Sequence, residues 1–167
     1  MSKRIVLDAS VLRSAGETMH PESRACREFL EHVRDICHRA AATRAMLDEW
    51  GGHQSKFASG WRRAMYARRK IVILTVQPDE AMRNRLLRPD LTSSESEALL
   101  KDIHLIEAAL AADRIVVSRD DRARTLFDVA ELNTVVWVNP VMYHPDCLTW
   151  LVDGAQPDDR WLLGRRA

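Results

Sequence analysis

Two of the acidic residues in this sequence follow short apolar runs, in positions where carboxylates often do chemistry. Asp8 ends the segment RIVLD, and Asp120 lies two residues after the segment RIVVS. Two further acids are Glu49, in AMLDEW, and Asp102, in the segment that leads to RIVVS. Ligands of parallel α/β sheets gather at the carboxyl ends of the strands. We therefore expect these four acids to meet in one cleft.

Each of these acids also has an ordinary structural interpretation. Asp8 can satisfy backbone groups in the turn after its strand, and Asp120 or Asp121 can cap the helix that follows. Glu49 and Asp102, taken singly, are typical of solvent-exposed helix residues. It is the combination of the four acids that favours a functional site.

Several carboxylates in one cleft call for a counter-ion. Two unit charges 4 Å apart repel by about 4 kcal/mol at an effective dielectric constant near 20. A divalent cation removes this cost, and hard oxygen ligands favour Mg²⁺ or Mn²⁺. Such an ion lowers the pKa of a bound water and stabilises the charge that develops on a phosphodiester. The acids therefore predict metal-dependent phosphodiester chemistry.

The elements that must position these acids alternate along the chain. Strands are expected at Arg4–Asp8, Lys70–Val76, Arg114–Ser118 and Thr134–Val138, with His38–Thr43 as either a short strand or a helix entry. Helices are expected at Glu22–Ile36, Arg44–Arg69, Asp79–Leu87 and Asp121–Glu131, and the capping box Thr92–Glu95 predicts another toward Ala111. This alternation predicts an α/β fold: a three-layer α/β/α arrangement with a central parallel sheet of four or five strands flanked by helices.

Length and composition limit the class of protein. The 167 residues are 46% hydrophobic, which suits one domain with a substantial core, expected over residues 1–140. Residues 141–167 are expected to form a tail that docks on this domain or at a subunit interface. No run approaches the roughly 20 apolar residues of a membrane-spanning helix, and Asp8 comes too early for a signal peptide. The three cysteines are odd in number and widely spaced, which indicates reduced thiols in a cytoplasm.

A basic segment offers a second functional feature. KFASGWRRAMYARRK, at residues 56–70, has no acid, although the whole chain has a net charge of only +1. Its arginines can contact the RNA backbone, and the candidates are Arg62, Arg63, Arg68 and Arg69. The alternative is a solvated helix face whose aromatic residues, Trp61 and Tyr66, belong to the core.

Other kinds of site lack their motifs. The sequence has no HExxH or CxxC for zinc, and no GxxxxGK[ST] or GxGxxG loop for nucleotide phosphates. A phosphatase of the haloacid type would have a second aspartate where Ser10 stands. His104, two residues after Asp102, either packs in its helix or lies close enough to tune a bound water.

Three segments together resemble the PIN-domain family of metal-dependent nucleases. These are RIVLDASVL, RAMLDEW and KDIHLIEAALAADRIVVSRDDRARTLF, and the resemblance runs from about Lys3 to Val138. It implies a PIN-like fold with four metal-site acids, Asp8, Glu49, Asp102 and Asp120, supported by Ser10 and Ser118. Two assignments stay open. Asp48 replaces Glu49 if the helix register differs, and Asp121 shares or takes the role of Asp120.

The resemblance also implies an activity and partners. Family members typically hold one or two Mg²⁺ or Mn²⁺ ions, and many are endoribonucleases that act as toxins neutralised by a cognate antitoxin protein. Many are homodimers. The expectation for this chain is an endoribonuclease of this kind, most simply a toxin. The alternatives are a housekeeping RNA-processing nuclease and a non-catalytic PIN-like module that binds RNA or protein.

Overall fold

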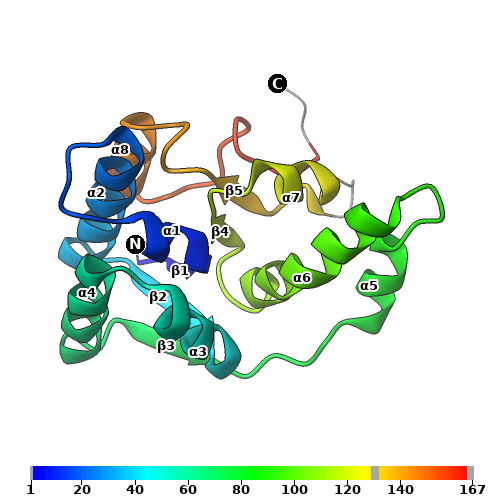
Figure 1. The fold of residues 1–167 in the computed structure, drawn as a ribbon, viewed down its shortest axis with the longest axis horizontal. Coiled ribbons are helices and arrows are strands. Elements are labelled where there is room, and N and C mark those ends of the chain that lie inside the picture. Colours follow the sequence, from blue (N-terminus) through cyan, green and yellow to red (C-terminus); the bar gives the residue numbers. More distant parts are fainter. Residues whose placement is uncertain (1, 129–131, 165–167) are drawn as a thin grey trace.

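The computed structural model describes residues 2–128 and 132–164 and has a central sheet of five parallel strands (Figure 1). The strands are β1 (Arg4–Leu7), β2 (Arg39–Thr43), β3 (Ile71–Leu74), β4 (Ile115–Val117) and β5 (Val136–Val138), in the order β3-β2-β1-β4-β5. The expected α/β class is thus confirmed. The alanine-rich segment after His38 forms a strand, not a helix entry, because its small side chains pack without exposure between β1 and β3.

The expected helices are present with changed bounds, and the first and last helices of the structure were not expected from the sequence. They are α1 (Ala9–Ser14), α2 (Pro21–Asp35), α3 (Arg44–His53), α4 (Lys56–Ala67), α5 (Glu80–Leu86), α6 (Ser93–Leu110), α7 (Asp121–Leu126) and α8 (Asp146–Val152). The long helical pattern of residues 44–69 divides into α3 and α4, because the Ser55 hydroxyl accepts a hydrogen bond from the Ala58 amide and starts a new helix. Helix α7 ends at Leu126; residues 129–131 of its predicted range lie outside the described residues.

The helices form two layers around the sheet, as a three-layer α/β/α fold requires. Helices α1 to α4 pack against one another and α8 packs on α2, whereas α6 packs on β1, β2, β4 and α7. Figure 1 shows these two groups of helices on opposite sides of the strands. The predicted capping box is present: the Thr92 hydroxyl accepts from the Glu95 amide, and the Glu95 carboxylate accepts from the Thr92 amide.

Two buried tryptophans connect the core to the end of β1. The Trp61 indole donates a hydrogen bond of 2.6 Å to the Leu30 carbonyl, which joins α4 to α2. The Trp50 indole donates a hydrogen bond of 3.1 Å to the Leu7 carbonyl. Leu7 immediately precedes Asp8, so the packing of α3 helps to hold the strand end at which the first acid lies.

The C-terminal segment lies against the sheet and α2. The Trp137 amide donates to the Trp161 carbonyl at 2.8 Å, and Leu162 forms an antiparallel bridge with Val136. His38, fully buried immediately before β2, contacts the Leu151 carbonyl of α8 at 2.7 Å. No helix in the described ranges is long and apolar enough to cross a membrane.

Candidate functional site

A pocket of about 460 Å³ opens at the carboxyl edge of the sheet. The four predicted acids all line it, although they come from four separate segments of the chain. The lining residues are Asp8, Ala9, Ser10, Arg13, Glu49, His53, Lys101, Asp102, Arg119, Asp120 and Asp121. Because β1 and β4 are adjacent and parallel, the residues that follow them reach the same place.

Two serine hydroxyls orient Asp8. Its Oδ2 atom accepts a hydrogen bond of 2.7 Å from Ser10 and one of 2.8 Å from Ser118. Ser118 is fully buried, and its hydroxyl also accepts a hydrogen bond of 3.0 Å from the Asp120 amide. The Ser10 hydroxyl accepts one of 3.2 Å from the Arg119 amide. Both serines therefore join the end of β1 to the turn after β4 and fix the carboxylate between them.

Asp102 is the acid whose ionisation the site perturbs most clearly. It lies on α6, is 7% exposed, and its pKa is raised to about 7. Burial is the largest cause of the raised pKa, and the negative charges of Asp8 and Asp120 add to it. The nearby Lys101 ammonium acts in the opposite direction and lowers the pKa, and a hydrogen bond with Asp120 is the smallest of the effects that raise it. Burial and the neighbouring carboxylates therefore make it costly to ionise all of these acids together.

Asp120 and Asp121 both line the pocket, and each also has a structural partner. Asp120 Oδ1 accepts a hydrogen bond of 2.9 Å from the Ala123 amide and caps α7. The capping role considered for Asp120 is therefore real, and it leaves the second carboxylate oxygen of this residue for other contacts. Asp121 Oδ2 accepts a hydrogen bond of 3.2 Å from the Asn139 side chain at the end of β5.

The structure distinguishes Glu49 from its neighbour Asp48. Glu49 is half-buried and lines the pocket, whereas Asp48 is exposed and does not line it. The register of α3 decides this, because Trp50 and Leu47 are buried on the face that packs on the core. His104 lies with its Nε2 atom 3.7 Å from Glu49 Oε2, so it is a neighbour of the glutamate and not of the pocket itself.

The donor set suits a hard divalent cation in kind. Carboxylate and hydroxyl oxygens line the pocket, and the charges of Asp8 and Asp120 contribute, after burial, to the raised pKa of Asp102. As they stand, however, no three or more His, Cys, Asp or Glu side chains of residues 2–128 and 132–164 are arranged as a ready metal site. The acids share one pocket, and the side chains must draw closer to share one ion.

The rim of the pocket also has four basic residues that were not predicted from the sequence: Arg13, His53, Lys101 and Arg119. Arg119 is held in place by a contact with the Ser14 hydroxyl and by an ion pair of 2.9 Å with Glu22. Lys101 precedes Asp102, and Arg119 lies between Ser118 and Asp120. For Lys101 and Arg119, adjacency to an acid in the sequence was the available signal, whereas Arg13 and His53 had none; only the fold shows that these four side chains reach the pocket.

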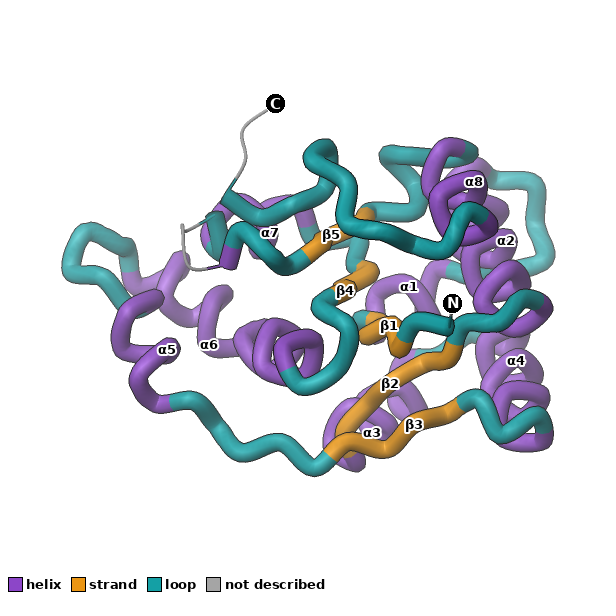
Figure 2. Tube along the Cα trace, turned by 180° about the vertical axis from the view of Figure 1, so that it is seen from behind, coloured by secondary structure: helices purple, strands orange, loops and turns teal. Residues whose placement is uncertain are grey.

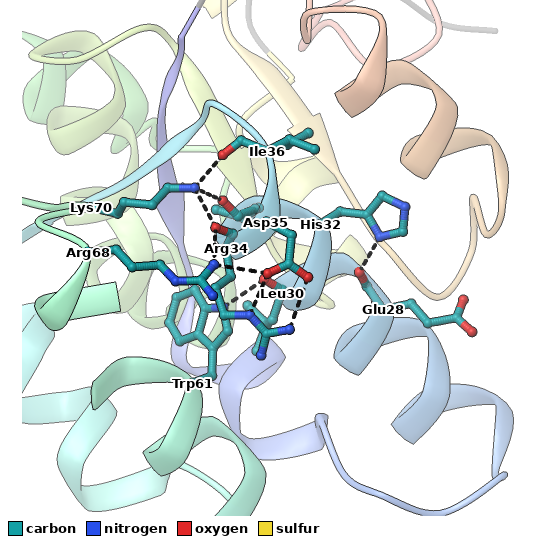
Figure 3. A network of polar contacts seen from close by, with 10 residues as sticks. Glu28, Leu30, His32, Arg34, Asp35, Ile36, Trp61, Arg68 and Lys70 are labelled. Atoms are coloured by element: carbon teal, nitrogen blue, oxygen red, sulfur yellow. Dashed lines mark hydrogen bonds and ion pairs between the residues drawn. The ribbon is translucent and has the colours of Figure 1, made fainter. Parts of the chain in front are cut away.

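The arginines proposed for RNA contact do not line this pocket. Arg68 and Arg69 precede β3 and so lie near the amino edge of the sheet, whereas the acids follow the carboxyl ends. Figure 3 shows Arg68 directed at Asp35, with Nη1 3.0 Å from Oδ1. The Lys70 ammonium donates to the carbonyls that end α2, including that of Arg34 at 2.7 Å (Figure 3).

The other two of these arginines lie within α4. The Arg62 guanidinium lies over the rings of Trp50 and Tyr66, with its carbon 6.0 Å and 5.8 Å from the ring centres. Arg63 is exposed. Trp61 belongs to the core and Tyr66 is 44% exposed, so the aromatic residues of this segment divide between the two interpretations. A role for these four arginines in RNA binding stays a prediction.

Comparison with models of known protein families gives no match, and comparison with curated proteins gives none either. What this chain does must therefore be inferred from its own residues and their arrangement.

Proposed function

We propose that this protein is a Mg²⁺- or Mn²⁺-dependent endoribonuclease with the carboxylate pocket as its active site. One observation carries the proposal: Asp8, Glu49, Asp102 and Asp120 come from four segments and line one pocket at the carboxyl edge of a parallel sheet. This is the place where ligands of such sheets bind. The resemblance of the three acid-bearing segments to PIN-domain nucleases supplies the reaction class.

The acids have distinct tasks in this proposal. Asp8, oriented by two serines, and Asp120, fixed by its cap to α7, are rigid donors, and Asp102 and Glu49 complete the set from two helices. A bound Mg²⁺ or Mn²⁺ would supply an activated water and balance the charge of the phosphodiester. Asp102 would give up a proton when the cation binds, because its raised pKa of about 7 leaves it about half protonated at pH 7 without one.

The basic rim gives the pocket its affinity for a phosphate chain. Arg13 and Lys101 are exposed at the pocket, and Arg119 is half-buried with its guanidinium fixed by Glu22. Arginine and lysine next to a metal-binding carboxylate cluster contact the non-reacting phosphate oxygens and hold the backbone in line. An acidic floor with a basic rim suits a polyanion better than a small neutral substrate.

A cleavage assay tests the proposal directly. Single-stranded RNA labelled at both ends is incubated with the purified protein in Mg²⁺, Mn²⁺ or EDTA. We expect internal cleavage with either ion and none in EDTA. Asp8→Asn is expected to lose at least about 100-fold in rate, which corresponds to about 2.7 kcal/mol of transition-state stabilisation. Asp48→Asn, a change in the exposed neighbour of Glu49, is the matched control and is expected to retain activity.

The outcomes separate the candidate functions. Cleavage that survives both EDTA and Asp8→Asn contradicts the proposed site. RNA binding without cleavage in any ion favours the non-catalytic module, for which the loose arrangement of the acids is the specific observation. The toxin role rests on the resemblance alone. Its test is growth arrest on expression of the wild type but not of Asp8→Asn, relieved by the product of an adjacent reading frame; arrest without such relief favours an RNA-processing enzyme.

A further inference from the structure

Strand β3 is an uncovered apolar edge of the sheet. It pairs only with β2 among the described strands, and Figure 2 shows it along the outer border of the molecule. Its sequence is IVIL, and none of its four residues is buried; Ile73 is 46% exposed. By contrast, every residue of β4 and β5 is buried. The chain leaves β3 through the non-helical residues 75–79, which do not fold back over this edge.

On this outer side, the backbone of β3 has hydrogen-bonding groups without a partner among the described residues. The Ala40 amide of β2 donates to the Lys70 carbonyl at 2.9 Å, so residues 70, 72 and 74 turn their backbone groups toward β2. Ile71 and Ile73 therefore turn theirs outward. Soluble proteins usually protect such an edge with a proline, an internal charge or a bulge. The segment Ile71–Val76 has no charge and no proline.

We propose that β3 pairs with β3 of a second copy of this chain in an antiparallel arrangement whose twofold axis passes at Val72. In this register, Ile71 of each copy lies opposite Ile73 of the other. The outward amide and carbonyl of each isoleucine then form hydrogen bonds with the opposite strand, and the isoleucine side chains cover one another on one face. The two five-stranded sheets become one continuous sheet. The inference does not depend on the nuclease activity.

Charge favours this orientation over a parallel one. Arg68, Arg69 and Lys70 precede β3, whereas the first charged residues after it are Asp79 and Glu80. A parallel pairing of two copies places the basic ends side by side. In the antiparallel pairing, the basic start of each strand lies beside the final residues of the partner strand. From there the partner chain continues toward Asp79 and Glu80. The antiparallel arrangement is thus complementary in hydrogen bonding and keeps the two basic ends apart.

Disulfide trapping tests the register. In this register the Val72 residues of the two copies lie directly opposite each other and do not hydrogen-bond to each other. Their Cα atoms are then about 4.5 Å apart, a separation that a disulfide can span. In a Cys37→Ser background, which removes the exposed native thiol, Val72→Cys is expected to form a covalent dimer rapidly on mild oxidation at micromolar protein concentrations. Ile73→Cys is the matched control. The residues at position 73 of the two copies are offset by two residues along the strands. Their Cα atoms are then about 8 Å apart, which is too far for a disulfide.

The native mass tests the interface without cysteines. We expect the wild type to have twice the chain mass of 19.1 kDa by light scattering. Ile73→Lys places two charges in the new interface and is expected to yield monomers, while Leu100→Lys, at a residue 47% exposed on α6, leaves the dimer intact. Melting temperatures of both variants show that they fold. A monomeric wild type, a dimer that survives Ile73→Lys, or equal cross-linking of Val72→Cys and Ile73→Cys would each overturn the proposal.

Discussion

The Ser118 hydroxyl donates a hydrogen bond of 2.8 Å to Asp8 Oδ2, although the two residues are 110 positions apart in the sequence. This contact links the carboxyl ends of β1 and β4, the adjacent strands that bring the first acid to the segment with Asp120. A buried hydroxyl immediately after β4 thus sets the direction of a carboxylate immediately after β1.

Removing this hydroxyl is expected to affect both stability and turnover. Ser118→Ala should lower the free energy of unfolding by about 1–2 kcal/mol, because the Asp120 amide and Asp8 each lose a partner. Cleavage should slow mainly through kcat, since Asp8 becomes misdirected while the basic rim is unchanged. Urea unfolding and steady-state kinetics measure the two effects. Ser118→Thr, which retains a hydroxyl, is expected to recover most of the rate; failure of this rescue would assign the loss to packing.

Asp102 is expected to make the protein less stable as the pH rises in EDTA. Its pKa of about 7 in the folded protein exceeds its ordinary value of 3.8, so between these values the folded chain binds more protons than the unfolded chain. The contribution of Asp102 to the free energy of unfolding is therefore greatest below about pH 4. It declines toward pH 7, by at most about 1.4 kcal/mol per pH unit. Asp102→Asn should remove this decline and be more stable than wild type at pH 7.5, as judged by thermal melting. Identical pH profiles would contradict the crowded-acid description.

Divalent ions are expected to reverse that loss of stability. We expect Mg²⁺ or Mn²⁺ to bind only the folded site and to raise the melting temperature of the wild type in proportion to the logarithm of its concentration. The shift should be smaller for Asp8→Asn and unchanged for Asp48→Asn. Equal shifts in all three proteins would mean that the ions bind elsewhere.

The two groups of basic residues are expected to differ in their contribution to RNA binding. Replacing Arg13 and Lys101 with glutamine should weaken binding and reduce the slope of log affinity against log salt by about 1–2. The same change at Arg68 and Arg69 should have a smaller effect, because Arg68 is paired with Asp35 at the other edge of the sheet. Fluorescence anisotropy with catalytically inactive Asp8→Asn protein measures both. If the changes at Arg68 and Arg69 have the larger effect, the basic segment of residues 56–70 becomes the favoured RNA-binding face.

His38 is expected to oppose Asp102 in the acid range. Burial lowers the pKa of His38, whose Nδ1 accepts from the Lys3 amide at 3.1 Å while Nε2 donates to the Leu151 carbonyl. In the unfolded chain, His38 takes up its proton at a higher pH than in the folded chain. The stabilisation that neutral His38 contributes is therefore present above about pH 6.5 and is lost as the pH falls. His38→Gln should be less stable at pH 7.5 and decline less steeply toward pH 5. Asp102 is present in both the wild type and His38→Gln, so its contribution cancels when the stabilities of the two proteins are subtracted.

Local pattern was sufficient for most of the fold. Strand β1 is predictable because β-branched and aliphatic residues from Ile5 to Leu7 suit a strand buried on both faces, and α6 because its capping box satisfies its first amides. The break between α3 and α4 was missed, since the pattern of apolar residues continues across Gln54 and only the Ser55 cap reveals a second helix.

The sequence by itself determined that the chain has an α/β fold and that its acids follow strands or lie on neighbouring helices, because periodicity and strand ends are local properties. Only the tertiary structure decided which carboxylate of Asp48 and Glu49 reaches the pocket and that Arg13 and Arg119 form its rim. It also placed Arg68 near the opposite edge. These relations depend on helix register and strand order, which long-range packing determines and a linear pattern does not contain.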